Sequence, residues 1–257
     1  MPQGLRRAVM SLPIIVPIRD HNWNDVKQVE KFGANHQVDT ATDPEDCWSQ
    51  GGTYTFLAAA TTLYVSSSSA SDTVSINIQG LDANWDLQTA SVTLTGQTQK
   101  VIPGTWLRIF RAYNEGAADL VGDVYIAGNA GAAITDGVPD VASLIKAKID
   151  IGDGQTMMAI YTVPNGYTGY MTRWYATLAI SRASYAVVQM KKRLFGGVFR
   201  TTREVGLTGA GNSIYQELLN IAIPYPAKTD LKITILEVGA NDMNIDGGFD
   251  LLLLADT

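Results

Sequence analysis

The stretch TLYVSSSSASDTVSINIQ, residues Thr62–Gln79, alternates apolar and polar side chains at both of its ends. An alternation with period two places successive side chains on opposite faces of a strand, so each end predicts a half-buried β-strand. The small polar residues Ser66–Asp72 between the two runs are typical of a turn. The stretch therefore predicts two strands joined by a turn.

The same alternation recurs along most of the chain. Further strands are predicted at 90–94, 98–102, 106–112, 120–127, 156–163, 168–180, 184–194, 198–205, 213–224, 231–238 and 249–254. Turn signals separate these strands at intervals of about 8–12 residues, as in sandwiches and barrels. Pro164–Gly166 predicts a hairpin because Asn-Gly tolerates positive φ, and the glycine-rich Gly206–Asn212 predicts a long loop. Residues 141–148 are compatible with one or two helical turns, in competition with a strand at Ile145–Ile151.

The sequence contains no long amphipathic helix, which predicts an all-β fold. The small-residue stretch Gly128–Pro139 predicts a linker. We therefore expect two tandem β-sandwich, jelly-roll-like units at 51–135 and 136–257, preceded by an extended N-terminal arm at 1–50.

The predicted arm lacks a sustained period and cannot bury itself alone, so we expect it to lie against its own domain or a neighbouring chain. Arg6 and Arg7 before an apolar patch also suggest a signal peptide, but Pro13 and Pro17 interrupt a helical core, which favours an arm. The predicted interface residues of the arm are Leu12, Ile14, Ile15, Val16, Ile18, Trp23 and Phe32.

The chain has 257 residues, of which 17% are charged, against about 25% in ordinary soluble proteins. Its net charge of −6 argues against a protein that coats nucleic acid, because phosphate binding needs clustered positive charge. No apolar run approaches the roughly 18 residues that cross a bilayer, so no membrane partner is predicted. A surface of uncharged polar groups indicates packed interfaces between chains.

Few residues suit catalysis or cofactor binding. The single cysteine, Cys47, excludes an internal disulfide and any multi-thiolate metal site, and a pair with His21 or His36 lacks an orienting group. The acidic residues between Asp39 and Asp46 are compatible with a glycosidase carboxylate pair, but a solvated turn or a partner for basic residues explains them better. We predict neither enzymatic activity nor a cofactor.

Two binding sites remain as candidates. Asp242, Asn244 and Asp246 match the first half of a calcium loop, but the twelfth position is Leu253, so a polar hairpin turn is the simpler interpretation. Tyr170 and Trp174 share strand parity and form a candidate glycan-binding face, for which core or interface packing is the alternative.

Short motifs of strands and turns lie at residues 38–39, 48, 51–56, 62–68, 72–73, 78–82, 106–108, 122–126, 159–164, 170–175, 193–200 and 247–251. Together these motifs resemble proteins encoded by tailed phages of marine bacteria. The resemblance covers roughly residues 36–257 and implies a structural component of a virion. It carries no catalytic residues.

This resemblance and the scarce charge predict a capsid decoration (cement) protein held on the head by its arm. We expect a homo-oligomer, with a trimer favoured, whose partners are the major capsid protein or other virion proteins. The protein would be located in the virion, assembled in the host cytoplasm, without direct nucleic-acid contact. The alternatives are a tail or fibre protein that contacts host glycan and a major shell subunit of a small virus, which usually requires a basic arm.

Overall fold

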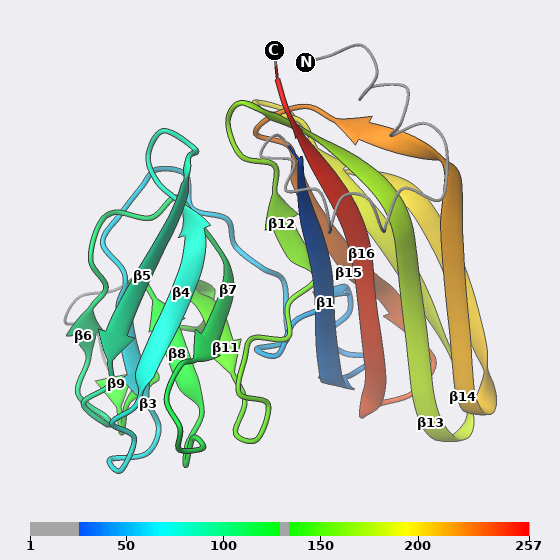
Figure 1. Ribbon diagram of the computed structural model, residues 1–257. Coiled ribbons are helices and arrows are strands. Elements are labelled where there is room, and N and C mark those ends of the chain that lie inside the picture. The colour runs from blue at the N-terminus through cyan, green and yellow to red at the C-terminus, as the bar shows by residue number, and fades with distance from the viewer. Residues whose placement is uncertain (1–25, 129–133, 257) are drawn as a thin grey trace.

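The computed structural model describes residues 26–128 and 134–256, and these are built almost entirely of antiparallel strands. The predicted all-β class is therefore confirmed. Two β-sandwiches lie side by side, and each encloses its own cluster of buried apolar side chains (Figure 1). Within the described ranges the helical structure is one 3-10 turn, η1 (Ala142–Leu144), and no described helix is long and apolar enough to cross a membrane.

A long two-stranded ribbon, β13 (Tyr167–Arg193) and β14 (Arg200–Tyr225), organises the larger sandwich. The two strands pair antiparallel along almost their whole length, with a register shift between Ile180 and Ser184. The ribbon folds over at this shift, so its two halves belong to opposite layers (Figure 1). Gly211 of β14 pairs with Ile180 at the same level, and its φ of 127° is open to glycine but not to other residues.

The long ribbon contributes two strands to each layer of this sandwich. One layer has the order β1 (Val26–Val38), β16 (Met243–Ala255), the first half of β13 and the second half of β14. The other has β2 (Glu45–Asp46) and β12 (Ile160–Thr162) on one edge of β15 (Asp230–Val238), followed by the second half of β13 and the first half of β14. Two facing sheets joined by a folded ribbon form a jelly roll.

The alternation of the strands fills the space between the two layers. Trp174 of β13 lies opposite Phe249 of β16, and both side chains are completely buried. Near the edge, a Cβ at Gly33 of β1 would lie 2.2 Å from the Cys47 carbonyl oxygen and 2.4 Å from the Ala159 nitrogen. Glycine is therefore required where β1 approaches the opposite layer.

The smaller sandwich lies between β2 and β12 in the sequence. Its first sheet has the order β11 (Ile145–Ile149), β8 (Val124–Ala127), β3 (Tyr64–Ser67) and β6 (Lys100–Val101). Its second sheet has the order β5 (Leu87–Thr93), β4 (Ser75–Leu81) and β7 (Arg108–Asn114). A separate two-stranded ladder joins β9 (Ile134–Thr135) and β10 (Val138–Pro139). Both predicted sandwich units are thus present.

The predicted borders of the units need correction. Residues 26–38, which the sequence placed in the arm, instead form β1 and pair with β16 of the jelly roll. This partner lies more than two hundred residues away in the sequence, so no local pattern predicts it. β11, placed in the second unit, instead pairs with β8 of the smaller sandwich. The smaller sandwich is therefore an insertion into the jelly roll. For residues 141–151 the helical and the strand alternatives are each partly correct, since the 3-10 turn η1 leads directly into β11.

Two local predictions in the second half are wrong. Pro164–Gly166 joins β12 to β13, but β12 pairs with β15 and not with β13, so the turn closes no hairpin. Gly206–Asn212 is not a loop, because it continues β14 in register with β13. Long-range pairing overrides the local signals at both places.

Candidate assembly interface

A buried ionic cluster joins the two sandwiches. The Asp230 carboxylate of the jelly roll accepts hydrogen bonds from Nε of Arg108 in the smaller sandwich at 2.9 Å and from Nη2 of Arg193 at 2.6 Å. The Arg108 and Asp230 side chains are only 6% and 4% exposed. Thr162 donates a further hydrogen bond to the same carboxylate at 2.5 Å. With these partners Asp230 is fully engaged and fixes the smaller sandwich on the jelly roll.

Aromatic rings cover the guanidinium groups of this cluster. The Arg193 guanidinium lies 4.7 Å from the ring centre of Phe56 and 4.6 Å from that of Phe199, and Arg108 lies 4.8 Å from that of Trp85. Rings at these distances attract the cations and keep water away from them. The cluster therefore acts as a structural anchor.

The predicted acidic segment divides in two: Asp39 and Asp43 flank an exposed turn, whereas Glu45 and Asp46 form a second buried cluster. Asp46 is completely buried, and it accepts hydrogen bonds from Nζ of Lys232 at 2.7 Å and from Thr234 at 2.7 Å. The Glu45 carboxylate accepts from the Gly52 amide at 2.6 Å. Partnership with a basic residue, one of the two interpretations favoured from the sequence, thus describes Asp46, whereas a solvated turn does not.

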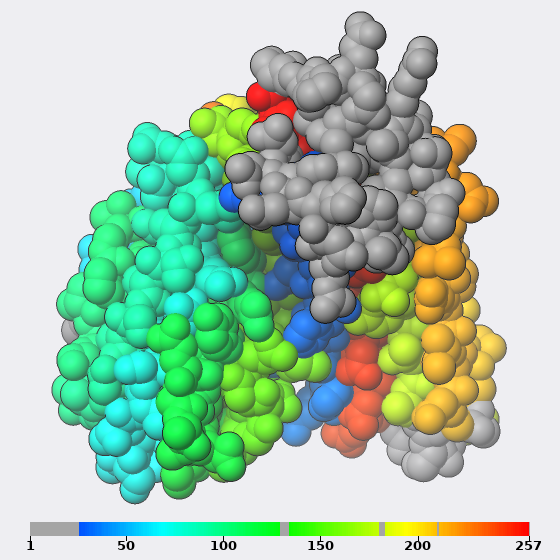
Figure 2. All heavy atoms as spheres, in the orientation of Figure 1, coloured from blue at the N-terminus to red at the C-terminus, as the bar shows by residue number. Residues whose placement is uncertain are grey.

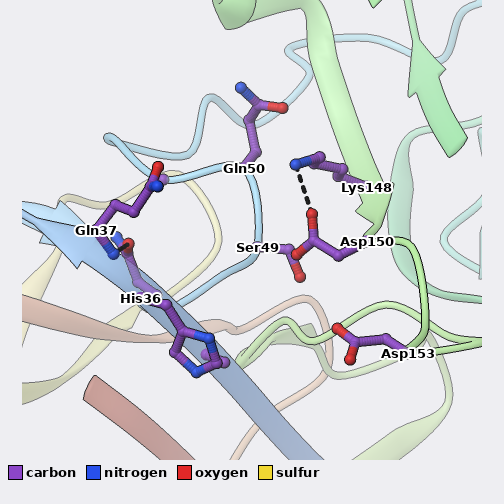
Figure 3. A pocket seen from close by; sticks show the side chains of 10 residues that line it. His36, Gln37, Ser49, Gln50, Lys148, Asp150 and Asp153 are labelled. Atoms are coloured by element: carbon purple, nitrogen blue, oxygen red, sulfur yellow. Dashed lines mark hydrogen bonds and ion pairs between the residues drawn. The ribbon is translucent and has the colours of Figure 1, made fainter. Parts of the chain in front are cut away.

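A polar cavity of about 360 Å³ opens between the sandwiches (Figure 3). It is lined by Ala34, Asn35, His36, Gln37, Ser49, Gln50, Gly51, Lys148, Asp150 and Asp153. Lys148 forms ion pairs with Asp150 at 2.5 Å and with Asp123 at 3.0 Å. Burial, followed by the negative charge of Asp150, raises the pKa of Asp153. The cavity presents charges of both signs that largely pair with each other.

Cys47 and His36 do not form a nucleophile–base pair. The Cys47 thiol is completely buried and its Sγ lies 3.8 Å from the Ile245 carbonyl oxygen. Burial raises the pKa of this thiol well above its usual value, which suppresses the thiolate that would attack a substrate. His36 Nε2 instead lies 3.1 Å from Asp246 on the exposed side of β1.

The calcium candidates do not lie in one loop: Asp242 lies in the bend before β16, with a positive φ of 56°, whereas Asn244 and Asp246 lie in the strand. Asn244 and Asp246 lie on β16, where residues two apart are about 7 Å apart and point in parallel, so their oxygens do not converge. Asp246 is engaged by His36 and by Thr177, whose hydroxyl donates at 3.3 Å. The predicted hairpin turn at Gly247 is also wrong, because β16 continues through this position.

The predicted glycan face does not exist. A register shift between Met171 and Arg173 reverses the parity of β13, so Tyr170 and Trp174 point to opposite faces of the sheet. Trp174 is completely buried and donates its indole N–H to Glu217 at 2.7 Å, whereas Tyr170 is half-buried. Trp174 therefore belongs to the core, the alternative weighed from the sequence.

Most of the predicted interface residues, namely Leu12, Ile14, Ile15, Val16, Ile18 and Trp23, lie outside the described residues. Phe32 lies on β1, half-buried and opposite Gly248 of β16. The role of these residues as an interface stays a prediction.

An exposed apolar edge on β14 was not predicted from the sequence. Within the described residues β14 pairs only with β13, so its other edge is open from end to end. Ile214, Leu218 and Ile221 on this strand are 73%, 66% and 79% exposed. Figure 2 shows the orange atoms of β14 along one margin of the molecule. The signal in the sequence is a stretch from Val205 to Ile223 with a single charged residue, Glu217.

Glu217 does not protect this edge. It faces the core side of the sheet, where its carboxylate accepts hydrogen bonds from Trp174 and, at 3.1 Å, from Nε of Arg203 in the opposite layer. Natural edge strands normally carry outward charges that prevent pairing with other chains. The second half of β14 lacks them, and this makes it the candidate assembly interface.

The comparisons with known proteins do not identify a family. No family model and no curated protein matches the chain. Solved structures that match include infectious bursal disease virus Gt strain, at 12% identity and a TM-score of 0.23, covering 95% of this chain and 78% of that one. The VP2 subviral particle of infectious bursal disease virus matches at 10% identity and a TM-score of 0.20, covering 90% and 72%. The PBSX exported protein XepA matches at 9% identity and a TM-score of 0.20, covering 87% and 84%. Likenesses at such scores carry no argument, so the fold described above depends on the strand pairing alone.

Proposed function

We propose that this chain is a structural component of a bacteriophage virion and acts as a capsid decoration protein. The observation that carries the proposal is a jelly roll whose edge strand presents uncharged, strongly exposed apolar side chains. An edge of this kind promotes aggregation unless a partner covers it. A virion supplies such partners in high local concentration. The resemblance to tailed-phage proteins and the scarcity of charge support the same role.

A second candidate is a shell subunit, because jelly rolls are common in viral capsids. The inserted sandwich, held rigidly by the Arg108–Asp230 pair, would then project from the shell. The glycan-contacting tail protein has lost its main support, since Trp174 is buried.

Labelling of purified virions tests the proposal. An antibody against the chain, visualised with gold particles by electron microscopy, should decorate the heads of the phage that encodes it. Peptides of the chain should also be found by mass spectrometry of the same particles. Absence of the chain from purified particles would contradict the proposal, and label on tails would favour the tail alternative.

A further inference from the structure

The second half of β14 has a self-complementary pattern of side chains. Its regular register with β13 from Gly211 to Leu218 places alternate residues on the outer face of the sheet. The outward residues within this regular register are Asn212, Ile214, Gln216 and Leu218. Beyond Leu218 the register with β13 shifts, and there both Asn220 and Ile221 are exposed. On either side of the Gln216 amide the next outward residue is aliphatic, Ile214 in one direction and Leu218 in the other. Such a palindrome is what a two-fold axis requires.

We propose that two copies of this chain pair antiparallel along the second half of β14, around a two-fold axis at Gln216. The inference rests on the proposed function in that it names one partner of the assembly interface. In this register the numbers of two residues that face each other across the axis always add up to 432. Ile214 then lies opposite Leu218 of the second copy, and Gln216 lies opposite Gln216 of the second copy.

The chemistry of each pair suits this register. Ile214 and Leu218 are 73% and 66% exposed in the single chain, and pairing buries them against each other twice, once on each side of the axis. The Gln216 amide both donates and accepts hydrogen bonds, so a pair of these amides at the axis is compatible. No outward charge faces a like charge, because Glu217 is turned toward Trp174 and Arg203.

The two halves of β14 explain why pairing would occur at one layer only. The first half, in the other layer, carries the exposed charged residues Arg200 and Glu204, and charges of this kind discourage edge-to-edge contact. The second half has none on its outer face. Pairing would join two four-stranded layers into one eight-stranded sheet with β1 at both ends.

Disulfide trapping in the full chain tests the register. Residues directly opposite in an antiparallel pair have Cα atoms about 4.5–5.5 Å apart, within the reach of a disulfide. Gln216→Cys should therefore form a covalent dimer under mild oxidation. The matched control is Asn212→Cys, which is also exposed on the same face but lies about 27 Å from its own copy in this register. The native Cys47 is buried and should not interfere.

A charge exchange tests the pairing without cysteine. Ile214→Lys and Leu218→Glu, each alone, should weaken the dimer about tenfold or more, as judged by sedimentation at several concentrations. The double variant places each Lys opposite a Glu and should restore the dimer. Rescue by the double variant separates loss of pairing from loss of folding.

Several results would overturn the two-fold pairing. Two of them are equal cross-linking of both cysteine variants and no rescue by the double charge variant. A third is a monomeric Gln216→Cys variant whose introduced thiol reacts slowly with a thiol reagent, because another segment of the chain covers the edge. The two proposals fail separately. If the chain is present in virions but does not cross-link, the pairing is wrong and the proposed function stands. If the chain cross-links but is absent from virions, the proposed function is wrong and the pairing stands.

Discussion

Lys31 places an ammonium group in a buried position between β1 and β7. Its Nζ donates to the Phe110 carbonyl oxygen, and burial, with a smaller contribution from Arg111, lowers the pKa of Lys31 to about 7. In the unfolded chain the group keeps its proton up to about pH 10.5. Between these values the unfolded state binds more protons, so the free energy of unfolding should rise with pH.

Lys31→Met should remove this contribution. Because one pKa unit corresponds to about 1.4 kcal/mol, the rise in the free energy of unfolding between pH 7 and pH 9 should be about 2 kcal/mol smaller in the variant. Urea denaturation at both pH values measures the difference. Lys27→Met, at an exposed position on the same strand, is the control and should keep the rise of the wild type. The same rise in both variants would show that Lys31 is not responsible.

At the scale of elements, the packing of β1 depends on Gly33. A methyl group there would meet backbone atoms of residues 47 and 159 on the opposite layer, and backbone cannot yield as a side chain tip can. Gly33→Ala should therefore lower the free energy of unfolding by about 2 kcal/mol or more. In Gly206→Ala the new methyl group meets open space, so its unfolding midpoint in urea should stay close to that of the wild type. A tolerant Gly33→Ala variant would mean that β1 lies farther from the opposite layer.

The sequence predicts where strands lie better than which strands pair. Alternation located most strands of both sandwiches, because it depends only on which face is buried. Pairing partners, such as β1 with β16, involve residues far apart in the sequence and have no local signature. The same limit explains the glycan face, since the register shift at Met171 that separates Tyr170 from Trp174 leaves no sign in the residues. The β14 edge, in contrast, was visible as a stretch nearly free of charge.

At the scale of the whole molecule, the Arg108–Asp230 pair should hold the two sandwiches together. Removing one member of a buried ion pair leaves the other charge without its partner, which typically costs about 3–5 kcal/mol. Arg108→Met should lower the free energy of unfolding by about 3 kcal/mol, measured by urea denaturation. Arg111→Met, on the same strand but exposed, should cost less than about 1 kcal/mol. Similar losses of unfolding free energy in the two variants would contradict the role of Arg108 as an anchor.

Self-assembly of the chain is tested by the mass of the purified protein in solution. Light scattering across a range of concentrations should give at least twice the 27.7 kDa of one chain, with a mass that falls on dilution. The Ile214→Lys variant should shift toward the single-chain mass at the same concentrations. A wild-type protein that stays at 27.7 kDa at every concentration would contradict the account.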